Sequence, residues 1–148
     1  MLPLSNLTDV THLIQLAIAP VFLLNAVASI IGVLINRLSR AVDRTRVLDD
    51  RLRLNRAEPG GVERDQLELL VLRRRLWLIY LALTCEVLCA LFVGLLIAAG
   101  FVGAMLGVNT SRGIASLFVL AMAAFIIGLT VFLREIFLAV VSTRDRMR

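Results

Sequence analysis

The sequence contains no lysine, one histidine and two cysteines among its 148 residues, and these shortages limit its chemistry. The single histidine, His12, lies far from the cysteines in sequence. Cys85, Glu86 and Cys89 would therefore supply only part of a zinc or copper ligand shell. The two cysteines are also neighbours on one predicted helix, which is poor geometry for a disulfide. The sequence has no nucleophile–base set and no phosphate-binding loop. We therefore expect no enzyme activity, no metal site and no cofactor.

Charged residues are almost missing from three long stretches of the chain, in which Glu86 is the one ionisable carboxylate apart from Glu135 at the end of the third. Hydrophobic residues make up 59% of the sequence and its mean hydropathy is +0.90, values typical of a membrane protein. The sequence therefore predicts an all-α integral membrane protein, a single membrane domain over residues 1–148. Because a transmembrane helix needs about 20 apolar residues, we expect the three spans at residues 13–36, 76–106 and 114–136. Gly107 to Gly113 should form a tight turn between the last two spans.

The arginines indicate which way the chain crosses the membrane. Eleven arginines and seven acidic residues lie between Asn36 and Leu76, and a basic tail from Ser142 follows an apolar turn after the third span. Positive charge near span ends favours the cytoplasmic side, so we expect residues 37–75 and the C-terminus inside and the N-terminus outside. The same bias explains the pI of 10.9 without a nucleic-acid partner. Residues 1–11 lack the basic start of a signal peptide, so we expect the first span to be retained.

The helical pattern continues from the first span into the charged segment. We expect one helix from Leu13 to Arg56, with Pro20 either bending it or marking its start. A Glu-Pro-Gly-Gly break at residues 58–61 ends this helix, and a second helix from Val62 leads into span two. Residues 37–75 should then form an antiparallel cytoplasmic hairpin continuous with spans one and two. Each arm carries an apolar stripe that would face the other arm or a neighbouring subunit. The stripes are Leu34, Leu38, Val42, Thr45, Leu48 and Leu52 on one arm and Leu67, Leu69, Leu70 and Leu72 on the other.

Polar residues recur every three or four positions along one side of this first helix. The candidate lining residues on that face are Asn25, Ser29, Gly32, Asn36, Arg40 and Asp43. One interpretation is a pore wall, formed when several copies place the face around an axis, with Arg40 and Asp43 at its cytoplasmic mouth. The alternative is ordinary helix packing, in which Asn25 hydrogen-bonds another helix and the small residues permit close approach.

Glu86 is an ionisable residue about 16 Å into the second predicted span, counted from Arg75 at 1.5 Å per residue. A carboxylate at that depth is expensive to bury, so it is a candidate site for a cation or for proton relay. Alternatively, it stays protonated and hydrogen-bonds Asn25 or Thr84 as a structural contact.

Several arginines near the span ends are candidates for lipid or anion contact, although a solvated positive face also explains them. These candidates are Arg37, Arg44, Arg73, Arg74 and Arg75. Arg134 and Glu135 lie near the cytoplasmic end of the third span, and we expect them to pair with Arg37 or Asp43 and hold the exit region in place.

Residues 36–46 read Asn-Arg-Leu-Ser-Arg-Ala-Val-Asp-Arg-Thr-Arg, follow a span containing Gly32, and precede three consecutive arginines at 73–75. In these features the chain resembles, over about residues 13–141, an uncharacterised family of small bacterial membrane proteins described as a domain of unknown function. The resemblance implies a multi-pass protein of the bacterial cytoplasmic (inner) membrane, with no established activity and no catalytic residue.

Two function hypotheses follow. The first is a homo-oligomeric channel or conduit for small ions, lined by the polar face of span one, because three spans from one copy hardly enclose a pathway. The second is a non-conducting membrane scaffold or sensor, whose cytoplasmic hairpin binds a partner. The expected contacts are therefore the lipid bilayer, further copies of the chain and small ions.

Overall fold

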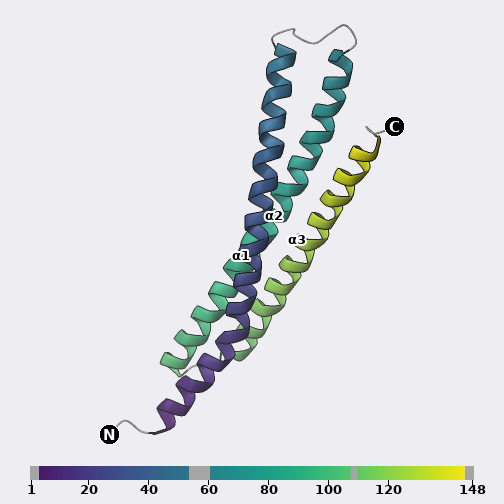
Figure 1. Cartoon of the computed structure of the whole chain (residues 1–148). Helices are drawn as coiled ribbons and strands as arrows, with labels where there is room; N and C mark the ends of the chain where they lie inside the picture. The colour runs from purple at the N-terminus through teal and green to yellow at the C-terminus, as the bar shows by residue number, and fades with distance from the viewer. Residues whose placement is uncertain (1–3, 54–60, 108–109, 146–148) are drawn as a thin grey trace. The chain divides into compact units, whose positions relative to one another are not determined.

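Three helices make up the computed structural model, which describes residues 4–53, 61–107 and 110–145, with backbone alone at 4–17, 53, 61, 63–64 and 140–145. They are α1 (Leu4–Arg53), α2 (Gly61–Leu106) and α3 (Ser111–Asp145), shown in Figure 1. Those described residues contain no strand. The prediction of an all-α fold is therefore confirmed. The expected Glu-Pro-Gly break before Gly61 lies outside the described residues.

Each helix is long and apolar enough to cross a membrane. The most apolar 18-residue stretches of α1, α2 and α3 have mean hydropathies of 2.4, 2.6 and 2.6. Such stretches exceed the length that the hydrocarbon layer requires. This confirms three candidate membrane spans and indicates a multi-pass membrane protein.

Two predicted helix boundaries are wrong. Helix α1 begins at Leu4 rather than Leu13, so Pro20 lies inside the helix and does not mark its start. A proline is tolerated inside such helices because neighbouring groups can satisfy the freed carbonyl. Helix α3 runs through Arg134 and on to Asp145, without the predicted apolar turn. Residues 136–141 contain no glycine or proline, so nothing there interrupts the hydrogen-bond ladder.

The connection between α2 and α3 is short, as predicted. Helix α2 ends at Leu106, and Gly107 follows with φ of 65°, the left-handed conformation that commonly ends a helix. The Thr110 carbonyl accepts the Ile114 N–H at 3.0 Å, which makes Thr110 the N-cap of α3. Residues 108–109 of the predicted turn lie outside the described residues.

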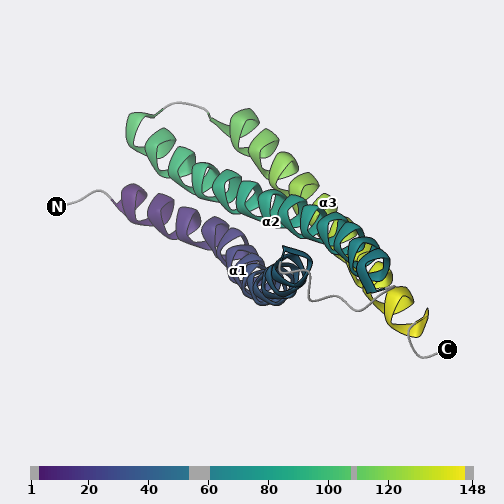
Figure 2. The same ribbon diagram turned by 90° about the horizontal axis from the view of Figure 1, so that it is seen from above.

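The chain forms two compact units. Unit 1 comprises α1 up to Ile31 together with Cys85–Ile126, and unit 2 comprises Gly32–Thr84 and the chain from Ile127. In unit 1, segments of all three helices meet, and α2 lies beside both α1 and α3 (Figure 2). The buried core of unit 1 consists of Val27, Cys89, Val93 and Ala121.

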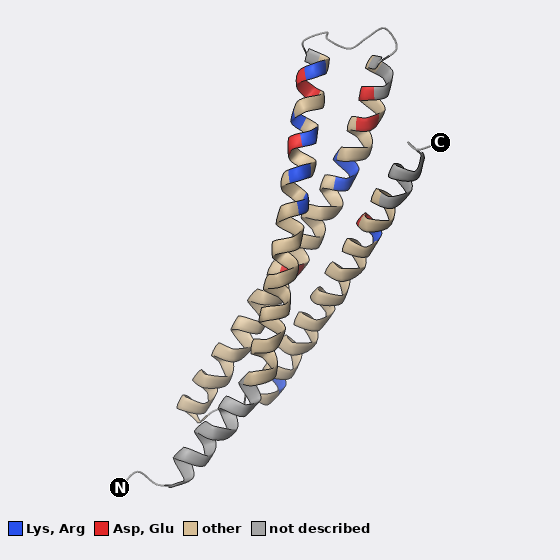
Figure 3. Cartoon of the chain, viewed as in Figure 1, with Lys and Arg blue, Asp and Glu red and all other residues tan. Residues whose placement is uncertain are grey.

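In unit 2, the α1 and α2 segments run side by side in opposite directions, and most charged residues lie along them (Figures 1 and 3). Leu48 of α1 packs against Leu69 and Leu72 of α2, with half-buried Leu52 beside them. The predicted contact between leucine stripes is therefore present within one copy. Only half of the α2 stripe takes part, because Leu67 and Leu70 are exposed.

Helix α1 buries a narrow line of side chains. Its buried residues in the two units are Pro20, Val27, Leu34, Ala41 and Leu48, each seven positions after the one before. A seven-residue repeat keeps one side of a helix facing its neighbours, as in coiled coils. The opposite side of α1 is left uncovered by the chain itself.

Candidate functional sites

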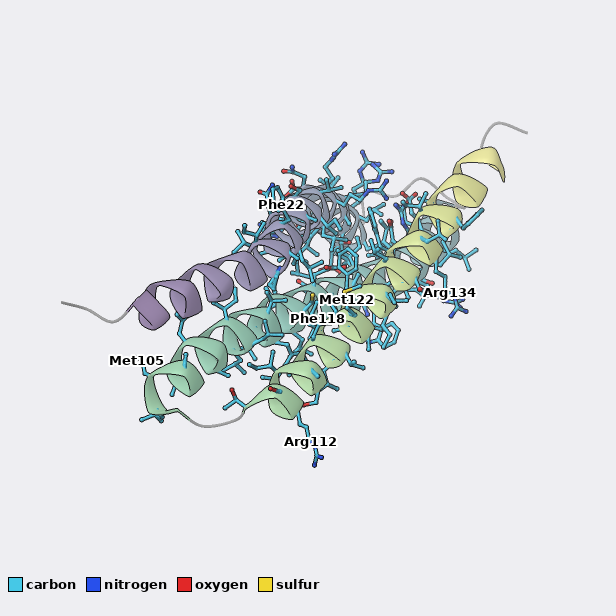
Figure 4. All side chains as sticks on the ribbon, turned by 90° about the horizontal axis from the view of Figure 1, so that it is seen from below. Phe22, Met105, Arg112, Phe118, Met122 and Arg134 are labelled. Atoms are coloured by element: carbon cyan, nitrogen blue, oxygen red, sulfur yellow. The ribbon has the colours of Figure 1, made fainter. Side chains whose placement is uncertain are left out.

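The uncovered side of α1 carries the predicted polar face. All of its candidate lining residues are exposed: Asn25, Ser29, Gly32, Asn36, Arg40 and Asp43. Phe22 continues this face with 71% of its surface exposed, and Figure 4 shows its side chain pointing away from the other helices. Within the described part of one copy, no helix therefore packs over this face.

Some polar groups on this face turn back onto their own helix. The Ser29 hydroxyl donates to the Asn25 carbonyl at 3.0 Å, and Arg40 Nε donates to the Asn36 carbonyl at 3.3 Å. Such bonds to the preceding turn satisfy a hydroxyl in an apolar environment. The structure records no partner for the side-chain amides of Asn25 and Asn36 among the residues it describes, so both amides are available to an external group.

Glu86 is completely buried. Its side chain is 0% exposed, and within the described residues neither carboxyl oxygen makes a hydrogen bond. The hydrogen bond to Asn25 or Thr84, which was one of two alternatives for Glu86, is not formed. Asn25 points to the exposed face of α1, and the Thr84 hydroxyl donates to the Tyr80 carbonyl at 2.9 Å instead.

The cysteines near Glu86 are both free thiols, with Cys89 buried and Cys85 half-buried. The described residues contain no group of three or more His, Cys, Asp or Glu side chains placed to hold a metal ion. Cys85, Glu86 and Cys89 therefore do not form a metal centre in this part of the chain.

Glu135, the second buried carboxylate, lies at the centre of an ion-pair cluster in unit 2. Arg37 Nη1 of α1 donates to Glu135 Oε2 at 2.6 Å, which confirms the predicted pair. Arg75 of α2 donates to Oε1 from Nη2 at 3.0 Å and from Nε at 3.3 Å. Arg37 also lies over the Phe132 ring, with its guanidinium carbon 5.3 Å from the centroid. Glu135 thereby joins all three helices.

Sequence reasoning missed the Arg75 contact, because residues 75 and 135 are 60 positions apart and no local pattern relates them. The available signal was that Glu135 is the one acidic residue between Ser111 and Ala139. A lone buried carboxylate between arginine-bearing helices needs more than one hydrogen-bond donor, since its two oxygens offer several acceptor sites.

The arginine candidates fall into two groups. Arg37 and Arg75 bind Glu135, and Arg44 binds Glu68 at 3.0 Å in a more exposed pair. Arg73 and Arg74 are exposed, and the structure records no ion pair for either among the residues it describes. These two arginines are therefore the candidates whose charge is open to a lipid or anion.

A family model described as "Protein of unknown function (DUF2721)" matches residues 17–144, which include the arginine-rich exit of the first span. The chain belongs to this family. The predicted resemblance to a domain of unknown function is confirmed over nearly the same residues. No curated protein and no solved structure matches the chain. Because the DUF2721 family is described as of unknown function, membership assigns no activity to the chain. A function must therefore be argued from the side chains.

Proposed function

We propose that several copies of this chain assemble in the bacterial cytoplasmic membrane around a conduit for small ions. The polar face of α1 would line that conduit, with Asn25, Ser29 and Asn36 facing the ions. The observation that carries the proposal is the complete exposure of this face in a single copy. Residues 37–75 and the C-terminus would lie in the cytoplasm and the N-terminus outside, as the arginine distribution favours.

The physical argument concerns what can cover the face. The amides of Asn25 and Asn36 and the hydroxyl of Ser29, all within the predicted span, are unfavourable against hydrocarbon chains. The chain does not cover these residues with its own helices, since α1 packs through its opposite side. Either water or an equivalent face from another copy would satisfy them. When several copies place this face around one axis, each face meets both water and the equivalent faces of the other copies.

Local charge and polarity suit the passage of small ions. Amide and hydroxyl oxygens at Asn25, Ser29 and Asn36 can replace part of an ion's hydration shell. Arg40 and Asp43 are exposed further along the same face and carry opposite charges. A ring of such residues would form a charged cytoplasmic mouth.

Cysteine accessibility tests this lining. In a background with Cys85→Ala and Cys89→Ala, we would introduce Asn25→Cys, Ser29→Cys or Asn36→Cys and record currents from the full chain in planar bilayers. A charged, water-soluble thiol reagent should react at these positions and block the current. The matched controls are Val27→Cys and Leu34→Cys, which lie on the buried side of α1 and should not react. Assembled protein that never conducts and is unreactive at all three positions would refute the conduit.

The exposed leucines of α2 favour a second candidate function. Leu67 and Leu70 lie within the charged segment 37–75 and are 63% and 64% exposed. A solvated helix would ordinarily carry polar residues at such positions. This pattern suits a non-conducting scaffold or sensor, in which residues 37–75 bind a partner protein in the cytoplasm. Replacing both leucines with glutamine would abolish partner capture under this alternative. Under the conduit proposal, the same variant would retain its current.

A further inference from the structure

No described residue supplies a hydrogen bond or a countercharge to the carboxyl group of Glu86. Its side chain is fully buried and both oxygens lack hydrogen bonds within the described residues. The buried core of unit 1, the unit to which Glu86 belongs, consists of the apolar residues Val27, Val93 and Ala121 with the thiol of Cys89, which lies three positions after Glu86 on α2. An ionised carboxylate placed there would lose its hydration and gain nothing in return.

The described side chains of unit 1 include few other charged or titratable groups. Residues 18–31 of α1 contain no ionisable side chain, and on α2 the only others are Cys85 and Cys89. Along α3 up to Ile126, Arg112 is the one charged residue, and it is exposed and points outward in Figure 4.

In unit 2, the arginine of α1 and the arginine of α2 that are nearest in sequence to unit 1 each have a partner. Arg37 of α1 and Arg75 of α2 both bind Glu135 of α3. Arg134, next to Glu135, is exposed and points outward in Figure 4. Tyr80 is the one titratable residue on α2 between Arg75 and Cys85, and its side chain is 51% exposed.

The number of oxygen atoms at Glu86 indicates whether the site suits a metal ion or a proton. A metal cation such as Ca²⁺ or Mg²⁺ needs about six oxygen ligands, whereas a proton needs one oxygen. Glu86 presents two oxygens, and no second carboxylate or hydroxyl hydrogen-bonds to it among the described residues. The chemistry of the site therefore suits a proton and not a metal ion.

We propose that Glu86 is a reversible proton-binding site. Its carboxyl carries a proton while unit 1 is packed, and releases that proton to water when the packing around it opens. The site goes beyond the conduit, because Glu86 is on α2 in a buried core and the proposed lining is the exposed side of α1. Failure of one proposal therefore leaves the other standing.

A hydrophobic carbodiimide provides the first test, because it reacts with protonated carboxyl groups and partitions into the membrane. The full chain in lipid vesicles would be treated with dicyclohexylcarbodiimide, and the adduct mapped by peptide mass spectrometry. We expect modification at Glu86 that slows as the pH rises and is lost completely in Glu86→Gln. The matched control is Glu135, which is equally buried but bound to two arginines, and should stay unmodified.

Infrared difference spectroscopy decides the protonation state even if the reagent cannot reach the site. Subtracting the spectrum of Glu86→Gln from that of the natural chain should leave a protonated carboxyl band at neutral pH. A carboxylate band in its place would overturn the proposal, as would carbodiimide modification that persists in Glu86→Gln.

The pH dependence of thermal stability gives an independent readout. The folded state holds the Glu86 proton, and the opened state releases it once the pH exceeds the ordinary range of a carboxyl group, so opening becomes more favourable as the pH rises. Glutamine is neutral throughout, so the melting temperature of Glu86→Gln relative to the natural chain should rise between about pH 5 and about pH 8. A constant difference over that range would contradict reversible proton binding.

Discussion

Glu135 in unit 2 and Glu86 in unit 1 are both 0% exposed, yet their surroundings differ completely. Glu135 accepts bonds from two guanidinium groups, which come from two different helices. Glu86 accepts none among the described residues. The same side chain is therefore accommodated in two ways within one short chain.

The difference teaches where an ionised group can be buried. At Glu135, the Coulomb attraction and the charge-assisted hydrogen bonds of two arginines offset the loss of hydration. Two arginines against one carboxylate leave a net positive charge, which the part-exposed Arg37 and Arg75 can share with their surroundings. At Glu86 nothing offsets the loss, so a bound proton is the remaining way to remove the charge.

The largest predicted effect comes from Glu135→Gln. This change removes the carboxylate but leaves Arg37 and Arg75 partly buried without their partner, and should cost about 3–5 kcal/mol in the free energy of unfolding. Titration of the full chain with sodium dodecyl sulfate in mixed micelles, followed by circular dichroism, measures this quantity. The matched control is Glu86→Gln, the same replacement at the other buried glutamate, which should not destabilise the protein at neutral pH. Equal losses in the two variants would remove the distinction between the two sites.

Removing one arginine should have a smaller effect. In Arg37→Gln or Arg75→Gln, Glu135 keeps one guanidinium partner, so each variant should lose about 1.5–3 kcal/mol in the same titration. Because both arginines bind one carboxylate, the double variant should deviate from the sum of the single losses. Strict additivity would show that the two arginines act independently of Glu135.

The smallest predicted effect belongs to the pair formed by Arg44 and Glu68. Their side chains are 44% and 21% exposed, so water competes with the ion pair. A double-mutant cycle with Arg44→Gln and Glu68→Gln should give a coupling energy of about 0.2–1 kcal/mol. Raising the salt concentration should reduce this coupling, while the coupling at Glu135 changes less because that cluster is buried. A coupling as large as that at Glu135 would contradict the assigned role of burial.

Much of the fold could be predicted from local patterns. The long uncharged stretches predicted three membrane-length helices, and the unbroken pattern after Ile35 predicted that α1 continues into the charged segment. The Gly107 turn was also correctly located. The start of α1 and the end of α3 were misjudged, because Pro20 and the Arg134–Glu135 charges look like breaks in sequence but do not stop a helix.

The candidate site was predicted less completely. The periodicity of α1 identified a polar face, and all of its members prove to lie on the exposed side of the helix. Arg37 with Glu135 was predicted from charge alone. The bonding of Arg75 to the same carboxylate was not predicted, and the expected bond from Glu86 to Asn25 is not formed.

By itself, the sequence determined the membrane class of the protein, its three helices, the concentration of charge in residues 37–75 and its family, because these are properties of composition and local periodicity. The tertiary structure decided which polar groups find partners. Successive residues of a helix point about 100° apart, so the rotation of each packed helix decides which of its side chains are buried. In α2, Leu69 and Leu72 are buried against α1, whereas Leu67 and Leu70 are exposed. The same selection gives Glu135 two arginines across 98 and 60 positions of sequence, and gives Glu86 none among the residues that the structure describes.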